Sequence, residues 1–345
     1  MTDELLDVRN LTVVYRRRGG ADLVALDDLS LALSPGRTLG LIGESGSGKS
    51  TAARAVMQLE RPRSGSVTLR GSNLTRMRGR TLRAARREMQ MVFQDPFGSF
   101  NPKATIGDSL TEPLLVHRMG DAAKRRARVA ELLDAVGLPV SVLDRYPAGL
   151  SGGQLQRLSI ARALSVGPAV VVADEPTSAL DVSIQAQIVN LLMSVQREFG
   201  VTYLFISHDL PLVSLLADDV IVLLRGRAVE SGPSAEVFDR PTHPYTRELL
   251  AAVPAATPAE ESARRRARDQ GPVVAPVGHH LSPAACPFAD RCPHREQVCL
   301  DVRPPVVPMA HGHSAACHFA ERLQLRQVSA VAGPADEAAT CRTWR

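Results

Sequence analysis

The chain has 345 residues, of which 44% are hydrophobic and 22% charged, with a formal net charge of +5. This is an ordinary globular composition, long enough for one large domain and an appendage. No run reaches the roughly 18 apolar residues of a membrane span, and the N-terminus shows no secretory leader, so we expect a cytoplasmic protein. Aromatic residues make up only 4% and do not interleave with the basic runs, which argues against nucleic-acid binding.

The first half of the chain combines strand and helix signals. Residues 5–14 and 66–70 are expected to be strands. Residues 38–59, TLGLIGESGSGKSTAARAVMQL, pass from an apolar strand through a Gly/Ser turn into an amphipathic helix. Helical periodicity then dominates from about residue 76 to 165, with breaks at turn-forming segments.

The following segments indicate a parallel sheet. AVVVADEP (169–176) is a short β-branched run typical of a strand covered on both faces. A helix over roughly 183–199 and a second buried strand, VTYLFIS (201–207), come next. We therefore predict an open α/β fold with phosphate chemistry at the carboxyl ends of its strands.

The composition changes after about residue 250, which predicts two domains, 1–250 and 251–345. A Pro/Ala-rich stretch beginning near 251 is expected to be a linker or loosely packed arm. A segment rich in Cys, His and Pro follows over 286–319, and the tail beyond it is expected to be disordered. His243 and Tyr245 of HPYT are expected to serve as capping and packing residues.

The strongest motif is GESGSGKS, which matches the P-loop pattern G-x-x-x-x-G-K-[ST] and lies between a strand and a helix. Its glycines allow successive N–H groups to face a phosphate, Lys49 supplies a point charge, and the Ser50 hydroxyl ligates Mg²⁺. The expected phosphate-binding residues are Gly43, Glu44, Ser45, Gly46, Ser47, Gly48, Lys49, Ser50 and Thr51.

Acidic residues at the end of the 169–176 strand complete a nucleotide site. Asp174 is placed to hold Mg²⁺, and Glu175 to polarise an attacking water. His208 ends the next strand at the same edge, which favours a contact with the γ-phosphate over a purely structural role.

A second phosphate-binding turn, LSGGQ (150–154), lies about a hundred residues after the P-loop, where Ser-Gly-Gly opens a helix. With the P-loop, VVVADEP, SALD (178–181) and His208, it resembles the nucleotide-binding subunits of ABC transporters in order and spacing. That resemblance covers roughly residues 5–250. It implies a P-loop core with an antiparallel β subdomain and a helical subdomain at about 95–165, and it implies Mg²⁺-dependent ATP hydrolysis.

The resemblance also answers whose phosphate the second turn binds. In that family LSGGQ contacts the ATP held by the opposite subunit, so two subunits enclose two ATP molecules head to tail. It implies that Tyr15 stacks on adenine, that Gln94 senses Mg²⁺ and water, and that Asp181 reaches across the dimer. Glu175 is then the catalytic base and His208 the switch. The signature residues that the resemblance implies for phosphate contact are Ser151, Gly152, Gly153 and Gln154.

Further segments resemble the dipeptide and oligopeptide importer ATPases, and within them the F-type subunit. These segments are VFQDPFGSFNP, DRYPAGLSGGQLQR, EPTSALDVSIQAQIVNLL and PTHPYTRELLAAVP. The resemblance implies a D-type partner ATPase, two transmembrane permeases, an external peptide-binding protein and a peripheral position on the cytoplasmic face of the membrane. Importers of nickel, glutathione and opines share much of this signature.

Four cysteines cluster in the C-terminal segment with the spacing C-x5-C-x6-C-x17-C. In a cytosolic protein this pattern suggests a metal rather than disulfides, and the wide spacing suits a [4Fe–4S] cluster, which the resemblance also implies. Zinc, with a histidine contributing, and free thiols are the alternatives. The expected cluster ligands are Cys286, Cys292, Cys299 and Cys317.

Two other function classes stay open beside a transport motor. The chain could be an ABC ATPase that acts on ribosomes or DNA repair complexes, although it shows only one cassette. It could also be a redox- or iron-responsive regulator that gates a transporter through its cysteines.

Overall fold

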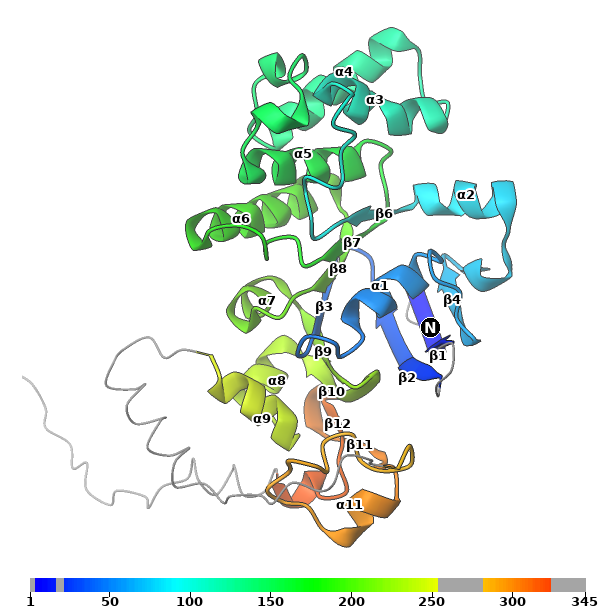
Figure 1. Cartoon of the computed structure of the whole chain (residues 1–345), viewed down its shortest axis with the longest axis vertical. Helices are drawn as coiled ribbons and strands as arrows, with labels where there is room; N and C mark the ends of the chain where they lie inside the picture. Colours follow the sequence, from blue (N-terminus) through cyan, green and yellow to red (C-terminus); the bar gives the residue numbers. More distant parts are fainter. Residues whose placement is uncertain (1–3, 17–21, 254–281, 324–345) are drawn as a thin grey trace, which may run out of the picture. The chain divides into compact units, whose positions relative to one another are not determined.

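The structure is a computed structural model that describes residues 4–16, 22–253 and 282–323 (Figure 1). Contacts within the chain divide it into two compact units, Met1–Ser234 and Ala235–Arg345. The expected boundary at 250 differs from this division, because helices α8 (Ser234–Asp239) and α9 (Pro244–Ala251) fall almost wholly in the second unit. The arm expected from residue 251 and the expected disordered tail lie largely outside the described residues.

A small antiparallel sheet forms the N-terminal part of the first unit, with strand order β2-β1-β4-β5. Strand β1 lies between β2 and β4, pairing Leu6 with Leu33 on one side and with Leu69 on the other. Alternating buried residues on β1 and β2 cover one face, as expected for a sheet packed on a core. The strands of this sheet are β1 (Leu6–Tyr15), β2 (Leu23–Leu33), β4 (Ser64–Leu69) and β5 (Ser72–Asn73).

The central sheet of the first unit has the strand order β10-β9-β3-β8-β7-β6. Strands β9, β3, β8, β7 and β6 are parallel neighbours, and β10 is antiparallel to β9. Every residue of β3, β7 and β8 is buried, because helices cover both faces. The strands are β3 (Thr38–Ile42), β6 (Met89–Val92), β7 (Val170–Asp174), β8 (Thr202–Ile206), β9 (Asp219–Leu224) and β10 (Arg227–Pro233).

Helix α1 (Lys49–Val56) covers one face of this sheet, and α6 (Val182–Phe199) and α7 (Leu210–Leu216) cover the other (Figure 1). Helices α3 (Ile106–Val116), α4 (Ala122–Ala135) and α5 (Gly152–Leu164) pack on one another as a helical group. Helix α2 (Gly79–Arg87) leads into β6. The predicted α/β fold with an antiparallel sheet and a helical subdomain is confirmed.

The second unit contains α8, α9, a short helix and a β-hairpin. The short helix is α11 (Gln297–Asp301), and the hairpin pairs β11 (Val306–Pro308) with β12 (Ser314–Ala316). His243 caps α9, because its Nδ1 accepts a hydrogen bond from the Tyr245 N–H at 3.1 Å. Tyr245 is fully buried against the Phe288 ring, so the expected capping and packing roles are confirmed. No helix in the described part of the chain has the length and apolarity needed to cross a membrane.

Candidate active site

The P-loop joins the carboxyl end of β3 to the start of α1 and requires glycine at two close approaches. A Cβ on Gly43 would lie 2.2 Å from the Leu223 carbonyl oxygen, and one on Gly48 would lie 2.6 Å from that of Ala25. Gly48 also has φ +107°, which other residues rarely adopt. Its position at the N-cap of α1 leaves free N–H groups at the positive end of the helix dipole.

The Lys49 ammonium lies inside this loop with only 5% of the residue exposed. It donates hydrogen bonds to the carbonyl oxygens of Gly43 (2.8 Å) and Glu44 (3.0 Å). Burial lowers the pKa of Lys49, while the nearby carboxylates of Glu175 and Asp174 oppose that effect. The buried ammonium has three N–H donors but only these two carbonyl acceptors within hydrogen-bond distance among the described residues. It is therefore suited to bind a phosphate.

Asp174 ends β7 and faces the first turn of α1. Its Oδ1 accepts a hydrogen bond from the Ser50 hydroxyl at 3.1 Å. Burial raises the pKa of Asp174, and the Ser50 hydrogen bond opposes that rise. A hydroxyl and a carboxylate in contact are the oxygen ligands that Mg²⁺ prefers, and the residues fit the expected metal.

Glu175 forms the centre of the site. Its carboxylate accepts a hydrogen bond from the Gln94 amide at 3.2 Å, and it lies 3.3 Å from His208 Nδ1 and 3.9 Å from Lys49 Nζ. Its backbone has φ 47°, a left-handed conformation that costs about 1–3 kcal/mol in a residue other than glycine. The Glu175 N–H donates to the Ile206 carbonyl at 2.9 Å, which holds the side chain at the strand ends.

Lys49, Ser50, Gln94 and Glu175 border one cavity of about 560 Å³, a size suited to a nucleotide. Asp174 and His208 contact these residues but are not on its lining. Tyr15 and the N-terminal part of β2 form its other wall, with Arg225, a residue that the sequence reasoning missed. The predicted residues on its lining are Tyr15, Ser45, Gly46, Gly48, Lys49, Ser50, Thr51, Gln94 and Glu175. The sequence thus predicted most of the residues that the fold brings together here.

The signature segment lies elsewhere in the same chain. Ser151 begins α5 in a capping box, in which its Oγ accepts from the Gln154 N–H and Gln154 Oε1 accepts from the Ser151 N–H. None of the residues 151–154 lines the P-loop cavity, and Asp181, exposed at the N-cap of α6, does not line it either. The signature segment and the P-loop cavity are therefore separate within this chain.

Gln185 on α6 is a positioning residue that the sequence reasoning missed. Its side-chain amide donates to the carbonyl oxygens of Thr177 (3.1 Å) and Leu180 (3.0 Å). It thereby fixes the loop between Glu175 and Asp181. No sequence signal distinguishes it from the neighbouring glutamine Gln187, because only the folded loop supplies its partners.

The four cysteines predicted as cluster ligands are all buried and unpaired by disulfides. Burial raises the pKa of the Cys286 thiol to about 12 and that of Cys292 to about 11, and the other thiols of the cluster contribute to both rises. Within the described ranges, no three His, Cys, Asp or Glu side chains are arranged as a metal site.

Comparisons with known proteins agree with this geometry. Residues 26–178 match the family model of the ABC transporter, and residues 229–299 match that of the oligopeptide/dipeptide transporter C-terminal region. A probable peptide ABC transporter ATP-binding protein of Sinorhizobium fredii is 44% identical, over 92% of this chain and 90% of its own. A di/tripeptide transport ATP-binding protein of Pseudomonas aeruginosa is 42% identical, over 93% and 99%.

Solved structures give the same result for the first unit. The ATP-binding cassette MJ0796, in a dimeric post-hydrolysis state bound to ADP and Pi, superposes with a TM-score of 0.61 at 30% identity, covering 66% of this chain and 98% of its own. The chain therefore belongs to the ATP-hydrolysing ABC transporter cassettes, with the C-terminal region of the oligopeptide and dipeptide transporter family following its ATPase domain.

Proposed function

We propose that this chain is a motor subunit that hydrolyses ATP at a head-to-tail interface with a second ATPase and thereby drives peptide import. The observation that carries this proposal is the separation of the signature segment from the P-loop cavity of the same chain. A second cassette, placed head to tail, would bring its own Ser151-type helix start onto the γ-phosphate, where N–H groups and the helix dipole stabilise the anion.

In this proposal each residue around Glu175 has a separate role in ATP hydrolysis. Lys49 binds the β- and γ-phosphates, and Ser50 and Asp174 hold Mg²⁺, directly and through water. Glu175 polarises the attacking water, with Gln94 and His208 contacting the same carboxylate. Tyr15 stacks on the adenine at the far wall of the cavity.

Two variants test the interface. Glu175→Gln abolishes turnover but keeps ATP binding, so the purified chain with its partner ATPase should form a stable ATP-dependent dimer by light scattering. Ser151→Asp keeps a good N-cap but adds a negative charge facing the γ-phosphate. In the Glu175→Gln background it should abolish the dimer and leave ATP binding within about two-fold. Wild-type hydrolysis by Glu175→Gln would overturn the base assignment, and an unaffected dimer in the double variant would overturn the head-to-tail interface.

We further propose that the permease docks in a groove next to Gln94. The groove has a volume of about 250 Å³, and its walls include Met57, Leu59 and Phe93. Leu59 and Phe93 are about half exposed, which favours an apolar partner surface. Phe93 is the direct neighbour of Gln94, so a segment seated there would reach the residue that contacts Glu175.

The assembly and its cargo are tested together by purifying the tagged chain from gently solubilised membranes of its host. We expect two permeases, a D-type ATPase and a binding protein, with peptide bound to the last. Phe93→Asp should lose the permeases and keep ATP binding. Nickel, glutathione or an opine on the binding protein would overturn the peptide cargo, and ribosomal or DNA-bound partners would overturn transport.

We also propose that the four buried cysteines ligate a [4Fe–4S] cluster. The donor set fits, because four buried thiols lie in one small unit, and burial together with the neighbouring thiols raises the pKa of Cys286 and Cys292. A bound cluster would compensate the charge of the thiolates and supply redox chemistry. Their arrangement is not yet that of a ligand set, so cluster binding requires the sulfurs to move together.

Anaerobic purification tests the cluster. Iron and labile sulfide should be present near four per chain, with visible absorbance that bleaches on reduction. Cys292→Ser should lose both, whereas Cys341→Ser, outside the described residues, should keep them. Bound zinc or metal-free protein would overturn the cluster, and an ATPase rate that follows the cluster's redox state would favour the regulatory function.

A further inference from the structure

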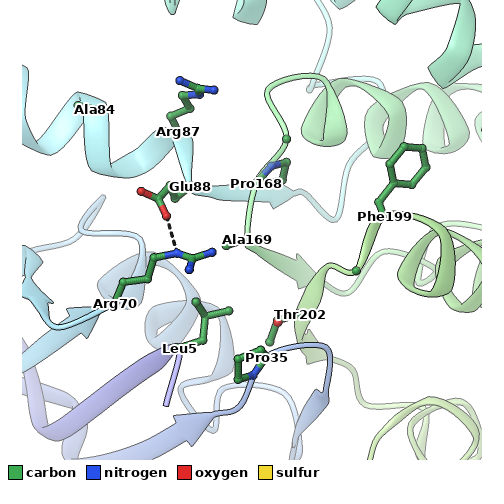
Figure 2. A pocket seen from close by; sticks show the side chains of 12 residues that line it. Leu5, Pro35, Arg70, Ala84, Arg87, Glu88, Pro168, Ala169, Phe199 and Thr202 are labelled. Atoms are coloured by element: carbon green, nitrogen blue, oxygen red, sulfur yellow. Dashed lines mark hydrogen bonds and ion pairs between the residues drawn. The ribbon is translucent and has the colours of Figure 1, made fainter. Parts of the chain in front are cut away.

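The first unit has two adjoining cavities near the amino ends of the central strands, opposite the edge that carries the P-loop cavity. The first, of about 490 Å³, is bordered by Glu88, Ala169 and Thr202, at or just before the amino ends of β6, β7 and β8 (Figure 2). Parallel strands carry the nucleotide site at their carboxyl ends, so this cavity is separated from it by the length of the strands, roughly 15 Å.

The second cavity, of about 380 Å³, shares Arg87 and Gly167 with the first. Its other walls come from the end of α3 and the first two turns of α4. The two cavities adjoin at these shared residues, and we call the pair the Arg87 groove. The basic residues on the lining of the second cavity are Arg87, Lys124, Arg125 and Arg128.

Basic side chains outnumber acidic ones on this lining. Five of the lining residues are Arg or Lys, and Glu88 is the one acid among them. Arg70 pairs with Glu88 at 2.8 Å across one wall, as Figure 2 shows. The groove therefore keeps an excess of positive charge after its own ion pair is counted.

Some of these cations have a structural role that needs no ligand. Arg128 donates to the Leu164 carbonyl at the end of α5 and pairs with Glu131. Arg125 donates to the Gly120 carbonyl at 2.7 Å. These two arginines complete helix ends and loops, as basic residues commonly do there.

Arg87 and Lys124 are not accounted for in this way. Within the described ranges, Arg87 makes one long hydrogen bond, from Nε to the Val166 carbonyl at 3.5 Å, which leaves its terminal nitrogens available. Among the described residues, no acceptor or ion-pair partner contacts the Lys124 ammonium. The nearby His117 is affected by the same positive charges. Burial lowers the pKa of His117, and the charges of Arg87 and Arg83 lower it further.

We propose that the Arg87 groove is a second anion site of this ATPase, which takes a phosphorylated small molecule with an apolar or planar body. The phosphate would bind between Arg87 and Lys124, since a guanidinium fork and an ammonium are the usual phosphate partners. The body would lie against Pro168 and Phe199 in the first half of the groove, which approaches the nucleotide cavity in volume. This site is separate from the residues proposed for hydrolysis.

Titration calorimetry on the full-length chain tests this proposal. The nucleotide site is first filled with a non-hydrolysable ATP analogue and Mg²⁺, unbound analogue and Mg²⁺ are removed by gel filtration, and inorganic pyrophosphate is then the probe. We expect saturable binding that weakens at least about ten-fold in the double variant Arg87→Ala/Lys124→Ala. The matched control is Arg80→Ala/Arg126→Ala, which removes exposed cations from the same two helices away from the groove. It should stay within about two-fold of wild type.

A second arm distinguishes the source of the phosphate. Vesicles of phosphatidylglycerol and phosphatidylcholine are sedimented with the chain, with and without pyrophosphate. Pyrophosphate binding without vesicle binding identifies a free phosphorylated ligand. Vesicle binding that pyrophosphate competes and the Arg87/Lys124 double variant loses identifies a lipid headgroup. Absence of both, or equal weakening in the double variant and its control, overturns the site.

Discussion

Burial acts on the two charged partners of the phosphate site in opposite directions. It lowers the pKa of Lys49 and raises that of Asp174, so each residue is less easily ionised than it would be in water. The proposed mechanism nevertheless needs both charges, Lys49 for phosphate and Asp174 for Mg²⁺. Keeping both residues charged in the folded chain is therefore unfavourable without Mg²⁺-ATP, and binding of Mg²⁺-ATP would offset that cost. Nucleotide binding should consequently increase the stability of the chain.

Asp174→Asn should therefore stabilise the nucleotide-free chain. A carboxyl whose pKa is raised by folding adds stability below its ordinary pKa of about 4, and this is lost as pH rises through the raised value. Thermal unfolding should show the variant's advantage growing from pH ~4 upward, to a few degrees at neutral pH. The variant should lose the Mg²⁺-dependent stabilisation by ATP. The exposed Asp181→Asn is the matched control, and an advantage independent of pH would contradict this account.

At the scale of elements, helix α6 holds the loop that joins Glu175 to Asp181. Gln185 near its N-terminus donates hydrogen bonds to the carbonyl oxygens of Thr177 and Leu180, between the proposed base Glu175 and the proposed cross-dimer residue Asp181. A loop held at two points moves as one piece with its helix. Glu175 and Asp181 are therefore expected to shift together if the proposed partner subunit binds.

Gln185→Leu should lower kcat about ten-fold while the KM for ATP changes less than about two-fold, because the loop is mispositioned but the phosphate cradle is intact. Gln185→Glu, which keeps the size but loses the donors, should behave likewise, and Gln185→Lys, which can donate again, should recover part of kcat. Asn190→Leu, an exposed position on the same helix, is the control. Equal losses in kcat and ATP affinity would indicate general damage to the fold instead.

The elements also show what the sequence could predict. The P-loop, Asp174 and Glu175 were predictable because each stands at the end of an apolar strand whose period and composition are local signals. Strand β6 was not, since Met89–Val92 is four residues long inside a stretch of helical periodicity and becomes a strand only by pairing with β7. Gln185 and the Arg87 groove depend on partners far apart in sequence, which no local pattern encodes.

At the scale of the whole molecule, the chain joins an ATPase unit to a second unit with its own core. In the second unit the Phe288 ring is 1% exposed and packs against Tyr245 and His243. Arg291 lies over the rings of Tyr245 and Phe288 and pairs with Glu248. These contacts tie residues near 245 to the cysteine segment, which is why the unit begins before the expected boundary at 250.

Phe288→Ala should consequently damage the second unit selectively. Removing a buried aromatic ring costs about 3–5 kcal/mol, a large fraction of the stability of so small a unit. Limited proteolysis should cleave the variant first within the described parts of the second unit, 235–253 and 282–323, while ATP binding stays within about two-fold of wild type. Phe319→Ala, a partly exposed ring in the same unit, is the milder control. If Phe288→Ala instead weakens ATP binding as strongly as Lys49→Ala, the damage is not confined to the second unit and this prediction is contradicted.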